Sequence, residues 1–310
     1  GDRISRLDRH STMAKHPVTP MEEADIRLHL AEQTKVPISA MNLVDLGGSL
    51  ADRLSVLNPL LESGDSRILV FDTVTMQDLH SCGELMRHSL EKSGPFVVGS
   101  SAVEAAWIST RKGLGQVSEP ANRLKQAEPF LVISGSASPK TASQIAHCRK
   151  LGWTILPLEP WNWFGGEDEE SVLEPIVRET VNLLQNGRDV VLISCEGPDD
   201  PSIRRTRDAA KAAGCSDPML RIGSMQGRLL RRVLDEIPLS RICVAGGDTS
   251  GYVSRELDIY GLEYLLSIDP GGPVCRARTD RYDHLEICLK GGQVGTSRYF
   301  ESVREGRKVD

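Results

Sequence analysis

A short apolar run that ends in two glycines and leads into a helix restricts the fold more than any other stretch. Residues 241–245 (Arg-Ile-Cys-Val-Ala) have the pattern of a buried strand, and Gly246-Gly247 follows them. Residues 252–257 predict the first turns of a helix that Thr249-Ser250 is able to cap. Glycines at such a turn let backbone N–H groups come close to a ligand, and a helix N-terminus favours a phosphate. The alternative interpretation is a tight turn that merely needs glycine.

Strands and helices alternate along the sequence, which predicts an α/β fold of two domains with mainly parallel sheets flanked by helices. The domains are expected over residues 1–115 and 127–310, joined by a linker over residues 116–126 that has no clear periodicity. In the first domain we expect helices over residues 21–33, 47–61 and 76–91 and one that runs through Trp107, and strands over residues 38–44, 67–72 and 95–99. In the second we expect strands over residues 130–134, 154–158, 189–194, 241–245, 264–268 and 284–289, and helices over residues 138–151, 172–185, 203–213, 218–236 and 297–303.

Composition excludes several classes of protein. The chain has 310 residues, of which 39% are hydrophobic and 26% charged, and its net charge of −6 gives no bulk attraction to nucleic acid or anionic membranes. No run approaches the roughly 20 apolar residues that span a bilayer, and the polar N-terminus has no signal core. The seven cysteines form no CxxC pair, and several lie in apolar runs. This pattern predicts reduced thiols in a cytoplasmic protein, without a disulfide framework or zinc site.

Three loops that follow strands of the second domain are candidates for a binding site. They cover residues 134–138 (Ser-Gly-Ser-Ala-Ser), 246–250 (Gly-Gly-Asp-Thr-Ser) and 290–295 (Lys-Gly-Gly-Gln-Val-Gly). Ligands of open α/β sheets bind beyond the carboxyl ends of the strands, so these loops converge if their strands are neighbours. They would offer N–H groups, small hydroxyls and one lysine, which suits a polyphosphate. Asp248 could hold Mg²⁺ directly or through water, because this ion prefers oxygen ligands.

Known nucleotide and catalytic fingerprints fit poorly. Residues 135–141 are similar to a P-loop but lack its second glycine and one residue of spacing, and residues 246–251 are not GxGxxG. HExxH, GxSxG and the kinase HRD and DFG motifs are absent from the sequence. Residues 159–170 are expected to form a loop whose aromatics fold onto their own domain, with adenine stacking as the alternative. No catalytic base is identified, and the strand-end residues Asp45, Asp72 and Ser100-Ser101 are substrate-side candidates for which strand-end solvation is the simpler explanation.

Several stretches together resemble the four-carbon acid sugar kinase family. They read LVISGSASPKTASQIAHCRKLGW, VAGGDTSGYVSRELDIYGLEYLLSIDPGGPVCRA and LKGGQVGTSRYFESV, with KHPVTPMEEADIRLHLAEQT and PFVVGSS nearer the N-terminus. The resemblance implies an amino-terminal substrate domain, a carboxy-terminal nucleotide-binding domain and ATP-dependent phosphorylation of a tetronate-like acid sugar. It also implies that residues 270–273 (Pro-Gly-Gly-Pro) shape a neighbouring wall. The residues it implies for the ATP site are Ser134, Ser136, Gly246, Gly247, Asp248, Thr249, Gly291 and Gly292.

The chain departs from the family pattern on the sugar side. The family's DD-x-TGA motif and Lys/Ser/Thr/Arg-Gly stretch are not found, so we expect residues 1–115 to be the later part of the substrate domain. Gln293 stands where asparagine is typical. The main alternative function is a non-catalytic nucleotide- or metabolite-binding protein, and a dinucleotide-dependent oxidoreductase is disfavoured by the missing GxGxxG. The expected partner is a small acid sugar rather than nucleic acid or membrane, and self-association into a homo-oligomer is left open.

Overall fold

The computed structural model of the chain describes residues 5–10, 13–14, 20–62, 67–93, 96–111, 123–166 and 168–308. The chain splits into two compact units, Gly1–Val117 and Ser118–Asp310. Most of the predicted linker over residues 116–126 lies outside the described residues, which resume at Arg123.

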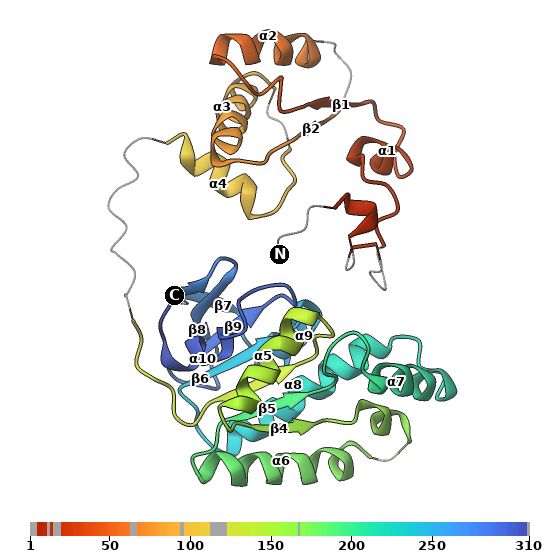
Figure 1. Cartoon of the computed structure of the whole chain (residues 1–310), viewed down its shortest axis with the longest axis vertical. Coiled ribbons are helices and arrows are strands. Elements are labelled where there is room, and N and C mark those ends of the chain that lie inside the picture. The colour runs from red at the N-terminus through yellow and green to blue at the C-terminus, as the bar shows by residue number, and fades with distance from the viewer. Residues whose placement is uncertain are drawn as a thin grey trace. The chain divides into compact units, whose positions relative to one another are not determined.

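The first unit is a small α/β layer (Figure 1). Its elements are η1 (Leu7–Arg9), α1 (Ile26–Ala31), β1 (Ile38–Met41), α2 (Leu50–Leu61), β2 (Ile68–Phe71), α3 (Met76–Ser93) and α4 (Ser101–Ser109). Within the described residues, β1 and β2 pair in parallel from Ile38 opposite Ile68. Met41, Leu57 and Leu85 are fully buried in a core that these strands share with α2, α3 and α4.

Two elements of the first unit differ clearly from the predictions. The strand predicted over residues 95–99 is wrong for its described part, since residues 96–99 form neither helix nor strand. The side chains of Phe96 and Val98 are 93% and 83% exposed. An apolar run becomes a strand only where a neighbouring strand takes up its N–H and C=O groups, and this run has no such neighbour among the described residues. Helix α1 begins at Ile26 instead of Met21, because the Asp25 carboxylate caps it by accepting from the Arg27 N–H.

The second unit holds the larger sheet. Its elements are β3 (Leu131–Ser134), α5 (Pro139–Lys150), β4 (Thr154–Pro157), η2 (Pro160–Phe164), α6 (Glu169–Gln185), β5 (Val190–Ile193), α7 (Pro201–Ala212), α8 (Pro218–Glu236), β6 (Arg241–Ala245), α9 (Gly247–Glu256), β7 (Gly261–Asp269), β8 (Gly272–Arg278), β9 (Glu286–Lys290) and α10 (Tyr299–Glu305).

Seven strands of the described chain form this sheet in the order β4-β5-β3-β6-β9-β8-β7. The first five are parallel, as predicted, whereas β8 runs antiparallel to both of its neighbours. Strand β8 was not predicted, because Pro273 and the arginines at 276 and 278 interrupt its apolar pattern. The segment predicted as a wall, residues 270–273, is the turn of the β7–β8 hairpin and the start of β8.

Helices cover both faces of the sheet (Figure 1). On one face, α6, α8 and α9 bury residues such as Val181, Leu229 and Val253 against the strands. On the other face, α5 and α10 bury Ile145 and Phe300. The aromatic segment after β4 is a short 3₁₀ helix, and Trp163 belongs to the first of these cores, so folding onto its own domain is the interpretation that holds.

Candidate functional site

The three predicted loops meet at one edge of the sheet. Strands β3, β6 and β9 are parallel neighbours, so the loops that follow them leave the sheet side by side. The Gly135 N–H donates to Ala245 O over 2.9 Å, and the Gly246 N–H donates to Lys290 O over 2.9 Å. The first and second loops are therefore each bonded through the main chain to the end of the neighbouring strand. We call the group of residues 134–138, 246–249 and 290–295 the loop cradle.

Side chains of α5 join the first loop to the third. Ser138 caps α5 by accepting from the Thr141 N–H, and its hydroxyl also donates to Gly292 O. The Thr141 hydroxyl lies 3.0 Å from Ser136 Oγ and 3.3 Å from Gly292 O. One turn further along α5, Gln144 Nε2 donates to two carbonyl oxygens, Val294 O over 3.0 Å and Thr296 O over 2.9 Å. Thr141 and Gln144 are buried, and their bonds, together with that of Ser138, tie the third loop to α5.

Two glycines allow the first loop and α9 to touch. A Cβ on Gly135 would collide with the Thr249 hydroxyl and would lie 3.0 Å from Gln226 Oε1. Gly246 has a φ of 129°, which other residues rarely adopt, and it is the residue that turns β6 into α9. The sequence therefore requires glycine here for close approach of main chain and side chain.

The N-terminus of α9 opens towards solvent. Its first intrahelical bond joins the Ser250 N–H to Gly246 O, so the preceding N–H groups have no acceptor within the helix. Gly247 and Asp248 are exposed, and a Cβ built on Gly247 meets no atom within 4 Å. The predicted caps Thr249 and Ser250 are wrong, because the helix starts at Gly247 and both residues lie inside it. Because Thr249 and Ser250 do not cap α9, its first N–H groups are available to an anion.

Lys290 lies beneath the cradle and not on its surface. Its side chain is 1% exposed, and its Nζ donates to Thr141 Oγ1 over 3.0 Å. Burial lowers the pKa of this ammonium, and no described carboxylate lies within ion-pair distance of it. We had expected Lys290 to be accessible to a bound polyphosphate, and its burial shows that this prediction is wrong. Its charge acts on the cradle through a hydroxyl and through space.

All eight sequence-predicted site residues lie in the cradle. They differ in exposure: Ser134, Ser136, Gly246 and Thr249 are buried, Gly291 and Gly292 are half-buried, and Gly247 and Asp248 are exposed. Three buried polar residues around the cradle were missed, namely Thr141, Gln144 and Gln226. Their positions in the sequence could have indicated them, because each lies on the same helix face as apolar core residues. A polar side chain buried on such a face needs a hydrogen-bond partner.

The described residues contain no cluster of three or more His, Cys, Asp or Glu side chains that could hold a metal by themselves. Asp248 is one exposed carboxylate at the start of α9. A donor set of one carboxylate and nearby hydroxyls fits Mg²⁺ only as it is carried by a ligand's own phosphates, because this ion keeps waters and binds few protein groups.

The substrate-side candidates of the first unit have local structural partners. Asp45 Oδ2 accepts from the Asn42 N–H over 2.9 Å and closes the turn after β1. Ser100 caps α4 by accepting from the Ala102 N–H, and Ser101 lies within that helix. Asp72 is exposed after β2.

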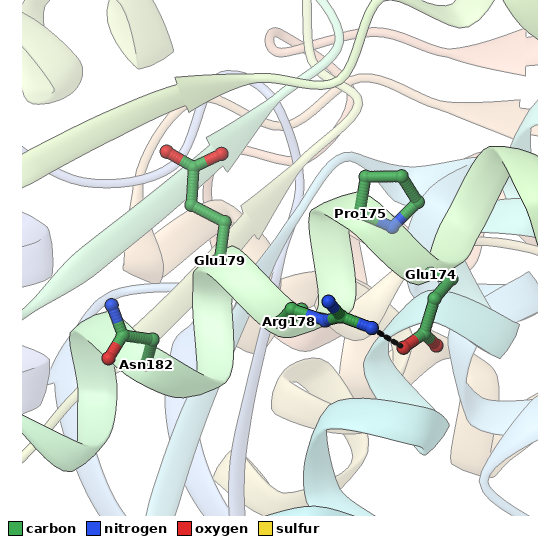
Figure 2. Close-up of a pocket in the computed structure, with 5 residues that line it drawn as sticks. All are labelled: Glu174, Pro175, Arg178, Glu179 and Asn182. Atoms are coloured by element: carbon green, nitrogen blue, oxygen red, sulfur yellow. Dashed lines mark hydrogen bonds and ion pairs between the residues drawn. The ribbon is translucent and has the colours of Figure 1, made fainter.

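A pocket on the outer face of α6 lies apart from the cradle. Figure 2 shows that its lining side chains all come from this one helix, with Arg178 paired to Glu174 over 3.3 Å. No cradle residue lines it. A single charged helix face of this kind is an ordinary solvated surface.

The fold is an open α/β domain with three glycine-rich loops at one edge of its sheet, and comparisons with known proteins place the chain in a family. The family described as nucleotide-binding C-terminal domain matches residues 131–300, and the sugar-binding N-terminal domain family matches residues 4–107. The chain belongs to the four-carbon acid sugar kinase family that these two domains characterise. No helix within the described ranges is long and apolar enough to cross a membrane.

Three curated relatives illustrate the range of similarity. The chain is 37% identical to a 3-oxo-isoapionate kinase of Paraburkholderia graminis, over 97% of this chain and 65% of the relative. It is 26% identical to a 3-oxo-tetronate kinase of Pectobacterium atrosepticum, over 97% of this chain and 68% of the relative. It is 24% identical to a 3-oxo-tetronate kinase of Pseudomonas fluorescens, over 94% of this chain and 64% of the relative. The chain thus spans about 65% of the length of the first of these relatives.

Two solved structures share the fold. A Haemophilus influenzae protein superposes with a TM-score of 0.60 at 21% identity, over 95% of this chain and 66% of the other. A Salmonella typhimurium protein superposes with a TM-score of 0.67 at 21% identity, over 94% of this chain and 65% of the other. At this identity the likeness concerns the fold alone.

Proposed function

We propose that residues 127–310 bind ATP and that the protein transfers its terminal phosphoryl group to a hydroxyl of a short acid sugar. The observation that carries the proposal is the open N-terminus of α9 between two loops that are bonded to it and to each other. Main-chain N–H groups at a helix N-terminus, small hydroxyls and nearby positive charge are the recurring features of phosphate sites in α/β sheets. Membership of a family with a nucleotide-binding domain supports the same assignment.

For the acceptor we propose a 3-oxo sugar acid. The curated relatives that cover most of this chain are named for 3-oxo-isoapionate or 3-oxo-tetronate. The first of these compounds is the better candidate, because identity to its kinase is 37% against 24–26% for the other two relatives. Residues 1–115 would contribute the later part of the sugar domain, joined by a linker over residues 116–126.

In this proposal the cradle works by position and charge. The N–H groups of Gly247 and the next residues hold phosphate oxygens, and the missing side chain of Gly247 leaves the space that the phosphates need. Gly135 and Gly246 let the first loop and the start of α9 pack against Thr249. Asp248 and the phosphates would share Mg²⁺, which supplies charge neutralisation when bound. Phosphoryl transfer depends mainly on such positioning and electrostatic stabilisation. The base that takes the proton of the sugar hydroxyl is not among the cradle residues.

The deciding experiment is calorimetric titration of the 310-residue chain with Mg-ATP and, separately, with NAD. Saturable binding of ATP alone supports the proposal. Binding of NAD in preference to ATP would favour an oxidoreductase and overturn it. A chain that binds ATP but transfers no phosphate to either 3-oxo acid in a coupled ADP assay would be the non-catalytic binding protein considered as the alternative.

The proposal also includes a cellular location and an oligomeric state. All seven cysteines are free thiols, and six of them lie on or beside core elements, which suits the cytoplasm. Self-association stays a prediction, which sedimentation of the purified chain would test.

A further inference from the structure

Lys140 occupies an unusual position next to the cradle. It is the second residue of α5, directly after Pro139, and Ser138 before them is bonded to Gly292 of the third loop. The side chain of Lys140 is half-buried, and among the described residues no carboxylate lies within ion-pair distance of it. A cation in the first turn of a helix is opposed by the helix dipole, so this placement costs stability in the absence of an anion.

A second lysine adds to the uncompensated charge. Lys290 is buried beneath the same loops and is bonded to Thr141, the residue after Lys140. Burial is the main cause that lowers the pKa of Lys290, and the positive charge of Lys140 lowers it as well. Asp248 is the only carboxylate that the cradle residues themselves contain. Two lysines thus belong to the cradle or adjoin it, whereas the cradle residues contain one acid.

We propose that Lys140 contacts the phosphates of the bound nucleotide and that Lys290 is a positioning residue that orients the loop hydroxyls from below. The inference rests on the proposed function, and it adds the ammonium of Lys140 to the main-chain N–H groups that bind the phosphates. A compact ammonium on a flexible stem suits phosphate oxygens as a point charge. Beside Gly135, the buried Gln226 Oε1 has no hydrogen-bond partner among the described residues, and as an acceptor it would take a donor that arrives with the nucleotide, such as a hydroxyl or a phosphate-bound water, and not a phosphate oxygen.

The test compares Lys140→Met with wild type in titrations with ATP, ADP and AMP in the presence of Mg²⁺. Loss of one charged hydrogen bond should weaken ATP binding about tenfold or more, with a smaller effect for ADP and the smallest for AMP. Lys140→Arg should restore part of the ATP affinity. The melting temperature without ligand should stay the same or rise, because the change removes a cation from the start of α5.

Lys150→Met is the matched control. It removes the same charge from the exposed last residue of the same helix, and it should leave the affinities for all three nucleotides unchanged. Equal ATP affinity in wild type and Lys140→Met would overturn the inference and leave the proposed function standing. Equal weakening by both variants would also overturn it, because the effect would then be long-range charge only. Absence of ATP binding by wild type would overturn the function and the inference together.

Discussion

A side chain at Gly247 would project into the space in front of α9, where the structure has no atom within 4 Å of the Cβ position. We therefore expect Gly247→Val to keep its fold, with a change in unfolding free energy of about 0.5 kcal/mol or less. Nucleotide affinity should fall below detection, because the valine methyls occupy the place of a phosphate. Calorimetric titration and thermal unfolding of the same sample measure both effects.

Gly251→Val is the control for that variant. Gly251 is exposed one turn later on α9, and its Cβ position also meets no atom within 4 Å. This variant should bind ATP as wild type does. Retained ATP affinity in Gly247→Val would contradict the assignment of the α9 N-terminus as a phosphate site.

The burial of Lys290 leads us to predict that stability depends on pH. Its pKa is lowered by burial from the usual 10.5, so between the lowered and the usual value the unfolded chain binds more protons than the folded chain. Stability of wild type should rise with pH across this interval, and Lys290→Met should lack the rise. The difference in unfolding free energy between Lys290→Met and wild type should therefore change as the pH rises towards 10.5, in favour of wild type. Urea unfolding at several pH values measures it, and a constant difference would contradict the burial of a charged lysine.

The packing of α8 on α9 sets where the α9 N-terminus lies. Gly223 and Gly227 face Tyr252 and Glu256, and a Cβ on Gly223 would collide with the Tyr252 ring. The two helices are therefore in close contact at two successive turns, first at Gly223 and Tyr252 and then at Gly227 and Glu256. Any displacement of α9 here moves its first N–H groups relative to the other two loops.

We expect Gly223→Ala to lower stability by about 1–3 kcal/mol and to weaken ATP binding, because α9 must shift. Tyr252→Ala removes the ring that causes the collision. In the double variant the loss should be smaller than the sum of the single losses by at least about 0.5 kcal/mol, with ATP affinity restored to that of Tyr252→Ala. Additive losses from denaturant titrations would show that the two helices are not in contact at this point.

Prediction from sequence succeeded where the signal is local. Ser138 before Pro139 correctly marks the start of α5, because a hydroxyl cap and an N-terminal proline act within one turn. The end of β6 at Ala245 was predicted correctly, but the start of α9 was placed too late, because nothing local shows that Gly247 is already helical. Strand β8 was missed because its partners β7 and β9, not its own residues, define it.

For the candidate site, the sequence indicated which loops matter but not how they are held. The convergence of three loops followed from the expectation that their strands are neighbours, and the strand order confirms it. The roles of Gln144 and Gln226 depend on contacts more than 90 residues away along the chain, to Val294 and Ser134, which no local pattern encodes.

The second unit contains everything that the cradle needs. Both of its hydrophobic cores lie between Leu124 and Val303, and the Leu124 N–H donates to Gly306 O over 2.8 Å, which joins the two ends of the unit. Residues 123–308 alone should therefore fold cooperatively and bind ATP within about threefold of the affinity of the whole chain. Circular dichroism melting and calorimetry of this fragment test it, and a fragment that folds but binds no nucleotide would show that the first unit completes the site.

The bonds from Gly135 to Ala245 and from Gly246 to Lys290 join main-chain atoms only. They survive almost any exchange of the side chains along β3, β6 and β9, provided that the small residues at the turns are kept. On the proposed function, a phosphate donor site held in this way can stay the same while mutation reshapes the sugar side for a new acid.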